Sequence, residues 1–211
     1  MISLNSGELE KKQLRKELDE LNSLLAQKSE IGETELLDFF KVRAQLILLM
    51  GRVVGVDAPQ KYNNELPLIG KFRSDFVVTN DSQSNYSFIE FEDAKENSIF
   101  NKTKNKKTSV YPWASRFEHG YSQVIDWYLH LSVNNQIQNM KAEFGAYKIS
   151  YSGALIIGRK KSLSRGDCNE RFEQRVEKSL IDSKHITCYT FDDLYEAMED
   201  QFVILSSFKK A

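Results

Sequence analysis

The sequence has little of several things that mark specialised classes of protein. Its 211 residues include two cysteines, Cys168 and Cys188, and no Cys-x-x-Cys pair, which disfavours a structural zinc site and a secreted disulfide scaffold. Three prolines and ten glycines exclude collagen-like and low-complexity chains. The longest apolar run, 46–50, is far shorter than the roughly 18 residues of a membrane span. The charged N-terminus does not suit a signal peptide. We therefore expect a cytoplasmic protein with no membrane partner.

No charge of one sign dominates either. Lys and Arg together number 29, and Asp and Glu number 30. Without a global basic excess, any contact with nucleic acid must come from a local patch. Hydrophobic residues make up 41% of the chain, which is enough for a sizeable buried core and argues against wholesale disorder.

The charged segment 8–28 carries leucines at intervals of four, three and four residues. This spacing predicts one apolar stripe on a helix. The stripe either docks on the helix's own domain or pairs between subunits, and three heptads do not decide between the two. We divide the chain into an N-terminal amphipathic helical segment, 1–31, as a candidate for homo-oligomerisation, and a domain over 32–211. The leucines are Leu14, Leu18, Leu21 and Leu25.

The rest of the chain alternates helical and strand-like patterns. A three- and four-residue apolar rhythm predicts a helix over 33–50 that Gly51 and Gly55 end, and a loop follows around Pro59. The polar turn cluster 80–85 predicts a hairpin. The order of elements indicates an α/β fold with a mixed sheet and helices on its faces. We expect strands at 66–72, 75–79, 86–92, 154–157 and 186–190, and helices at 114–133, at 169–180 and from Asp192, its predicted N-cap.

Acidic residues gather where a predicted strand ends. Glu90 and Glu92 share one face of their strand because side chains alternate, and Asp75 on the preceding strand can approach Glu90 across the hairpin. Acids at the end of an apolar strand repel each other and are costly to desolvate. A divalent cation would compensate them, and Mg²⁺ prefers oxygen ligands. The alternative is that these acids line a solvated edge of the sheet.

Basic and polar residues follow this strand. The loop 101–111 carries four lysines, which either neutralise DNA phosphates or serve solubility. On the next helix, Arg116, His119 and Gln123 share one face. His119 is a candidate proton carrier or phosphate donor, or a packing residue. The lysines are Lys102, Lys104, Lys106 and Lys107.

Several motifs in this order resemble the PD-(D/E)XK nuclease superfamily, and more closely the Shedu-type anti-phage defence nucleases. They include Ser-Asp-Phe-Val-Val at 74–78, Ile-Glu-Phe-Glu-Asp-Ala-Lys at 89–95, His-Gly-Tyr-Ser-Gln at 119–123, Gly-Ala-Leu-Ile-Ile-Gly-Arg at 153–159 and Tyr-Thr-Phe-Asp-Asp-Leu at 189–194. The resemblance covers residue 33 to the C-terminus. It implies a restriction-endonuclease-like mixed central sheet flanked by helices.

The resemblance also implies roles for particular residues. Asp75 and Glu90 would be metal ligands, the backbone carbonyl of Phe91 would complete the coordination, and Gln123 would bind water or phosphate. Glu92 stands where the superfamily usually has its catalytic lysine. A glutamate there can hold a second ion or act as a base, but it gives no positive charge to the attacked phosphate. Glu35, on the preceding helix, is a candidate further ligand or an exposed first-turn glutamate.

These observations predict a Mg²⁺-dependent DNA endonuclease in prokaryotic defence against phage or foreign DNA, with Mn²⁺ able to substitute. Lys95 replaces the missing lysine only if the chain curls back after the strand. The alternative is a catalytically inactive module of the same fold that binds nucleic acid or regulates a partner. The residues expected to contact DNA are Lys95, Lys102, Lys104, Lys106, Lys107, Arg116 and His119.

Overall fold

A computed structural model describes residues 3–68, 72–134, 138–146 and 148–207. Its centre is a six-stranded sheet in which the strands lie side by side in chain order. The first four strands are antiparallel neighbours, whereas the last two run parallel to the fourth. The predicted α/β mixed sheet is therefore confirmed. The strands are β1 (Asn5–Ser6), β2 (Pro59–Leu68), β3 (Phe72–Asn80), β4 (Asn85–Phe91), β5 (Ser150–Ile156) and β6 (Ile186–Tyr189).

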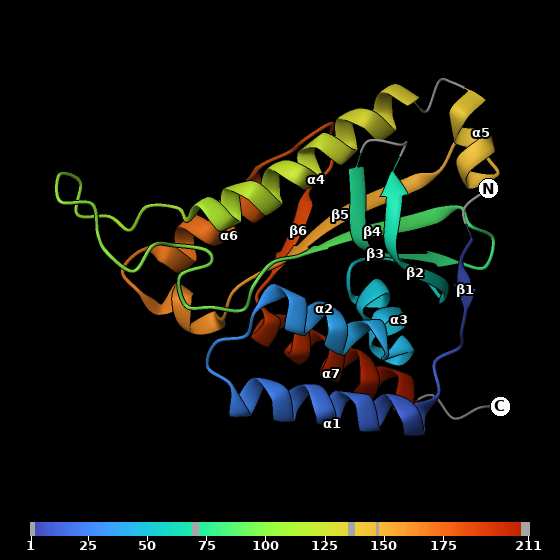
Figure 1. The fold of residues 1–211 in the computed structure, drawn as a ribbon, viewed down its shortest axis with the longest axis horizontal. Helices are drawn as coiled ribbons and strands as arrows, with labels where there is room; N and C mark the ends of the chain where they lie inside the picture. Colours follow the sequence, from blue (N-terminus) through green and yellow to red (C-terminus); the bar gives the residue numbers. More distant parts are fainter. Residues whose placement is uncertain (1–2, 69–71, 135–137, 147, 208–211) are drawn as a thin grey trace.

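Helices cover both faces of the sheet (Figure 1). On one face lie α4 (Ser115–Asn134) and α6 (Cys168–Lys178), with α5 (Gln138–Phe144) beyond the end of α4. On the other face lie α1 (Lys11–Gln27), α2 (Glu33–Lys41), α3 (Ala44–Val53) and α7 (Phe191–Ser207). A short 3-10 helix, η1 (Lys160–Ser164), precedes α6. Within the described ranges, no helix is long and apolar enough to cross a bilayer.

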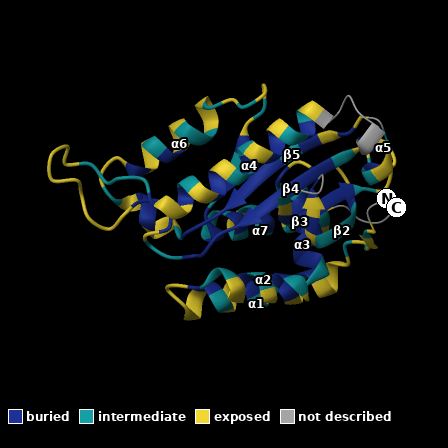
Figure 2. Ribbon diagram, turned by 45° about the horizontal axis from the view of Figure 1, so that its top comes forward, coloured by how far each residue is buried: buried dark blue, intermediate teal, exposed yellow. Residues whose placement is uncertain are grey.

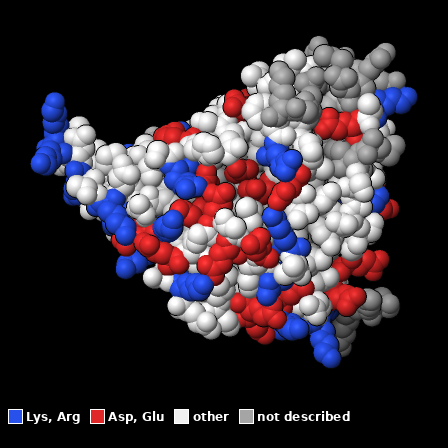
Figure 3. Space-filling model, viewed as in Figure 1, with Lys and Arg blue, Asp and Glu red and all other residues white. Residues whose placement is uncertain are grey.

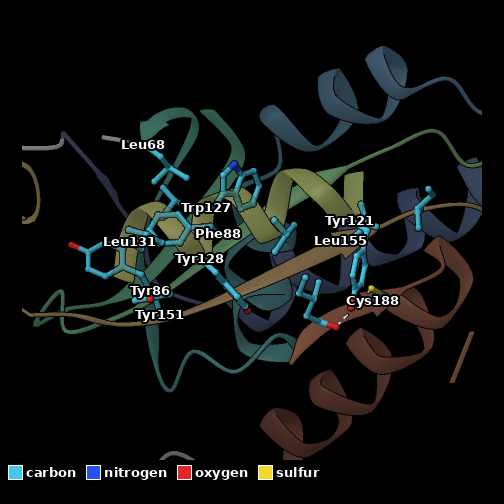
Figure 4. Packing of buried hydrophobic residues seen from close by; sticks show 14 of the residues in the cluster. Leu68, Tyr86, Phe88, Tyr121, Trp127, Tyr128, Leu131, Tyr151, Leu155 and Cys188 are labelled. Atoms are coloured by element: carbon cyan, nitrogen blue, oxygen red, sulfur yellow. Dashed lines mark hydrogen bonds between the residues drawn. The ribbon is translucent and has the colours of Figure 1, made fainter. Parts of the chain in front are cut away.

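Strand β4 distributes its side chains between the two helical layers. Tyr86 and Phe88 pack into the core beneath α4, where Trp127 and Tyr128 meet them (Figure 4). Ile89 and Phe91 pack into the opposite core, and the strand is buried along its length (Figure 2). Because alternate residues of a strand share a face, the positions after Phe88 that face α4 are 90 and 92.

The leucine stripe of α1 lies inside this domain. Its four leucines are at most 6% exposed and belong to the same core as residues of α3 and α7. Arg159 ties down the end of the helix, because its Nη1 donates to the carbonyl of Lys28 at 2.6 Å and its Nη2 to that of Leu25 at 3.1 Å. Of the two alternatives for the stripe, the structure shows docking on the own domain. Self-association remains a prediction and would need another surface.

The structure corrects two predictions in the N-terminal half. The predicted helix 33–50 is two helices, α2 and α3, separated at Val42 and Arg43. The backbone N–H of Arg43 donates to the carbonyl of Phe40, a tight turn that no glycine or proline announces. Pro59 opens β2 instead of lying in a loop.

Other differences lie at element ends. Of the predicted strand 66–72, residues 69–71 lie outside the described residues; Leu68 ends β2 and Phe72 begins β3. Helix α5 was not predicted from the sequence. Thr190, and not Asp192, caps α7, since its Oγ1 accepts the backbone N–H of Asp193 at 3.1 Å. The side chain of Asp192 binds Arg159 instead.

Candidate functional site

Asp75 and Glu90 meet where β3 and β4 pair. The last paired residues there are Phe76 and Ile89, so the antiparallel register sets Asp75 opposite Glu90. The backbone N–H of Phe91 donates to Oδ2 of Asp75 at 2.7 Å. From α4, the side-chain amide of Gln123 donates to Oε1 of Glu90. One oxygen of each carboxylate is thus held in place, and the predicted approach of these two acids is confirmed.

The second oxygen of Glu90 is left in an unfavourable state. The side chain is 7% exposed, and Oε2 is buried with no hydrogen-bond partner among the described residues. Burial raises the pKa of Glu90 far above its ordinary value of 4.5, and the charges of Asp75 and Glu92 add to the shift. Burial also raises the pKa of Asp75, against the hydrogen bond from Phe91, which lowers it. Two carboxyls in this environment bind protons tightly and would gain from a cation between them.

Glu92 faces the same layer but already has two partners on α4. Its Oε2 accepts a hydrogen bond from Nη1 of Arg116 at 2.8 Å, and its Oε1 lies 3.1 Å from Nδ1 of His119. Glu92 is only 2% exposed, whereas the side chain of His119 is 67% exposed. Burial raises the pKa of Glu92, and the hydrogen bonds from Arg116 and His119 oppose that shift. The predicted polar face of α4 therefore lies against the acids.

Gly120 allows α4 to come this close. A Cβ at this position would lie 2.7 Å from the Leu155 side chain and 3.0 Å from Cγ of Glu92. Real Cβ atoms do not come as close as the shorter distance, so a larger residue here would force the Leu155 side chain or the helix to move. A glycine inside a helix costs about 0.5–1 kcal/mol relative to alanine. Here it brings Arg116 and His119 within reach of Glu92, a role that the sequence motif did not reveal.

A glutamate that the sequence analysis missed lies next to these acids. Oε2 of Glu33, the first residue of α2, lies 2.7 Å from Nη1 of Arg116. Its charge raises the pKa values of Asp75, Glu90 and Glu92. Glu35, predicted as the additional acid, instead pairs with Lys28 at the surface. Both glutamates belong to the first turn of one helix, so composition alone does not distinguish them.

The expected convergence of three carboxylates is not what the structure shows. Within the ranges that it describes, no three or more His, Cys, Asp or Glu side chains form a group that could hold a metal ion. The pair Asp75 and Glu90 is brought together, whereas the carboxylate of Glu92 is turned to Arg116 and His119. The acids thus form a pair with an unsatisfied oxygen and a third acid that is already bound.

Lys95 lies after the end of β4, at a local turn in which the backbone N–H of Ser98 donates to the carbonyl of Lys95 at 3.3 Å. Ala94 forms an isolated bridge with Ile31, and the backbone N–H of Lys95 donates to Oγ of Ser98 at 3.1 Å. The ammonium group of Lys95 lies 2.7 Å from Oδ2 of Asp93. Because this charge is paired with Asp93, a role for Lys95 in place of the missing lysine stays a prediction.

The four lysines of the basic loop are exposed on an arm, residues 101–111, that extends from the body of the protein (Figure 1). Figure 3 shows basic atoms at the tip of this arm and acidic atoms gathered across the middle of the same face. The base of the arm is fixed: the guanidinium group of Arg165 donates to the backbone carbonyls of Glu96, Phe100 and Asn101 at 3.1–3.4 Å. The arm is therefore anchored where it leaves the domain, and its exposed part carries the positive charge.

Comparison with known protein families assigns the chain to a family. A family model described as Shedu protein SduA, C-terminal, matches residues 10–195, which is most of the chain and includes α1. No curated protein matches the chain. The chain belongs to this Shedu SduA C-terminal family, an anti-phage defence nuclease family.

Proposed function

We propose that this protein is a Mg²⁺-dependent DNA endonuclease of the PD-(D/E)XK type that acts against phage or other foreign DNA. The family supports a nuclease in defence. The observation that carries the proposal is the pair of carboxylates at 75 and 90, in which a buried oxygen of Glu90 has no hydrogen-bond partner among the described residues. Proteins rarely leave such a group unsatisfied without a functional reason.

The two acids fit a magnesium ion. Both offer carboxylate oxygens, and Mg²⁺ is commonly held by one or two carboxylates, several waters and substrate phosphates instead of a full protein cage. The carbonyl of Phe91 is the proposed third protein ligand. A bound Mg²⁺ supplies a Lewis acid and a water of lowered pKa for phosphodiester hydrolysis. The absence of a three-residue ligand group among the described residues is compatible with this mode of binding.

The surrounding residues have separate tasks. Gln123 donates to Glu90 and fixes the rotamer of its carboxylate. Glu92, with both oxygens engaged, holds Arg116 and His119 against the site. The lysines of the arm attract the phosphate backbone without reading sequence, which offsets the repulsion between the acids and DNA.

The test is cleavage of supercoiled and linear DNA with Mg²⁺ or Mn²⁺. We expect Asp75→Asn to lower the cleavage rate about 100-fold or more. Mutating a residue that merely supports a metal ligand already lowers activity about 10–100-fold. Asp126→Asn, on the exposed side of α4, is the matched control and should cleave like the wild type. Equal rates for wild type and Asp75→Asn would refute the assignment of the metal site.

A second function is favoured by one observation: both oxygens of Glu92 are taken and no positive charge stands at position 92. A catalytically inactive module that binds DNA predicts that binding survives chelation and that no divalent ion produces cleavage. Measuring DNA binding with and without EDTA beside the cleavage assay separates the two functions.

A further inference from the structure

The acidic site has to accept a negatively charged substrate. Four carboxylates act on one another here: Glu33, Asp75, Glu90 and Glu92. One metal ion offsets only part of their charge, and a phosphodiester that approaches them brings another negative charge. A phosphate group at this site therefore needs a cation from the protein at short range.

Two nearby lysines are committed elsewhere. The ammonium group of Lys95 contacts Asp93 at 2.7 Å. Lys41, whose charge lowers the pKa of Asp75, donates its hydrogen bond to Glu65 at 2.5 Å. Both would have to give up a carboxylate before they could reach a phosphate.

Arg116 is placed differently. A single nitrogen, Nη1, contacts the two nearest carboxylates, Glu92 at 2.8 Å and Glu33 at 2.7 Å, while Nε lies 4.0 Å from Oδ2 of Asp93. Its Nη2 makes no hydrogen bond to any residue that the structure describes, and 45% of the side chain is exposed. The guanidinium group is thus fixed from the buried side while its outer edge is accessible. A guanidinium has five N–H donors in a planar fork that fits phosphate oxygens, so two partners do not exhaust it.

The two carboxylates also set the position of this charge. Glu92 is buried directly after β4 and Glu33 begins α2, so Arg116 is held between the end of a strand and a helix of the opposite layer. A long side chain held at two points loses less conformational entropy when it binds a phosphate than one that is loose in solvent.

We propose that Arg116 binds the phosphate that is attacked at this site, and that Glu92 and Glu33 position its guanidinium group. The positive charge that a glutamate at position 92 cannot supply from the strand comes instead from the first turn of α4. Glu92 is a positioning residue in this arrangement. The proposal rests on the proposed nuclease function.

The competing explanation is that Arg116 only neutralises the buried Glu92. Comparison of Arg116→Gln with Arg116→Gln/Glu92→Gln distinguishes the two. The single variant leaves a buried carboxylate without its cation and should unfold at lower temperature. The double variant removes both charges and should regain much of the wild-type unfolding temperature. If Arg116 binds phosphate, cleavage stays about 100-fold or more below wild type in both variants, as expected when a group that stabilises transition-state charge is lost.

A charge relocation sharpens the test. Arg116→Gln/Glu92→Lys moves the cation from the helix to the strand, and we expect it to cleave at least about tenfold faster than Arg116→Gln, because the phosphate again meets a positive charge. Arg175→Gln is the matched control. Arg175, on α6, pairs at 2.7 Å with Glu118, which lies on α4 like Arg116. This variant should cleave like the wild type.

DNA binding in Ca²⁺ gives a readout that does not depend on cleavage. The logarithm of the DNA-binding constant falls as the logarithm of the salt concentration rises, and loss of one phosphate contact makes this slope less steep by about 0.9. We expect this decrease in Arg116→Gln and in Arg116→Gln/Glu92→Gln. A slope and a cleavage rate equal to wild type in Arg116→Gln/Glu92→Gln would overturn the proposal. If wild type cleaves no DNA, the nuclease assignment fails, and the salt slope alone then decides whether Arg116 contacts phosphate.

Discussion

Two clusters of charged residues lie at the ends of neighbouring strands, and they differ in how completely they are satisfied. Beyond β5, the guanidinium group of Arg159 donates to both oxygens of Asp192 at 2.8–3.1 Å and to two carbonyls at the end of α1. Burial would raise the pKa of Asp192, but the hydrogen bonds from Arg159 and from the backbone N–H of Lys160 outweigh it and the pKa is lowered. Beside it, at β4, burial raises the pKa of Glu90 and one of its oxygens has no partner among the described residues.

The difference separates structure from chemistry. The cluster around Arg159 joins α1, β5 and α7, and its charged groups find opposite charges or carbonyls. Asp75 and Glu90 form no ion pair with a cation among the described residues, so the cost of burying their carboxylates is not offset. Unsatisfied buried groups of this kind are where binding energy for a ligand is available. Both clusters belong to motifs that the sequence analysis quoted, so motif membership alone does not distinguish them.

The largest expected effect on stability comes from breaking the satisfied cluster. Arg159→Gln removes the guanidinium hydrogen bonds to Asp192 and those to the two carbonyls at the end of α1. We expect the free energy of unfolding to fall by about 2–3 kcal/mol, near the lower end for breaking a buried pair, since both side chains are partly exposed. Urea denaturation measures this loss.

Lys160→Gln is the control for that experiment. Its ammonium group also binds Asp193 and Glu196, but its side chain is 54% exposed. Exposed ion pairs contribute about 0–1 kcal/mol. If Lys160→Gln and Arg159→Gln lower the free energy of unfolding by the same amount, the cluster around Arg159 has no special structural role. The contrast drawn here between the two charged clusters is then wrong.

A substitution at Glu90 is expected to stabilise the protein instead of destabilising it. Glu90→Gln in EDTA should raise the free energy of unfolding by about 1–3 kcal/mol, the cost of a buried unsatisfied group. The new amide can donate to Asp75 and still accept the hydrogen bond from Gln123. The same variant should lose the proposed cleavage activity, because it removes an anionic ligand from the proposed metal site.

This gain should depend on pH. The pKa of Glu90 in the folded protein lies above its ordinary value of 4.5. The folded state therefore holds the proton more tightly than the unfolded state, and the wild type loses stability as pH rises above about 4.5 toward the raised pKa. The difference between Glu90→Gln and wild type should widen from pH 5 to pH 8. Glu170→Gln, at an exposed position, should show no such widening. A constant difference would mean that Glu90 does not titrate abnormally.

The parts of this site that the sequence predicted depend on local geometry. A strand repeats every two residues, so 90 and 92 had to share a face, and the hairpin at 80–85 fixed the register that sets Asp75 opposite Glu90. A helix repeats every 3.6 residues, so Arg116, His119 and Gln123 also had to share a face. The structure shows that this face meets the acids.

The parts that were missed depend on how elements dock. Which glutamate of α2 approaches the site depends on how that helix docks, and the helix ends before Val42 without a glycine or proline signal. The partners of Glu92, on α4, lie 24 and 27 residues further along the chain. The burial that makes Oε2 of Glu90 unsatisfied is likewise a property of the packed molecule.

The smallest effect on stability is expected at the arm, which belongs to neither cluster. Replacing Lys102, Lys104, Lys106 and Lys107 by glutamine should change the free energy of unfolding by less than about 0.5 kcal/mol, because the side chains are exposed. DNA affinity at low salt should fall, and the salt slope should decrease by up to about 3–4 if every lysine contacts a phosphate. Fluorescence anisotropy over a salt series measures both.

Arg165→Gln keeps all four lysines but removes the hydrogen bonds that anchor the arm. A similar loss of affinity in this variant would show that the position of the arm matters as well as its charge. An unchanged slope in the four-lysine variant would assign these lysines to solubility and leave the acids without their proposed electrostatic counterweight.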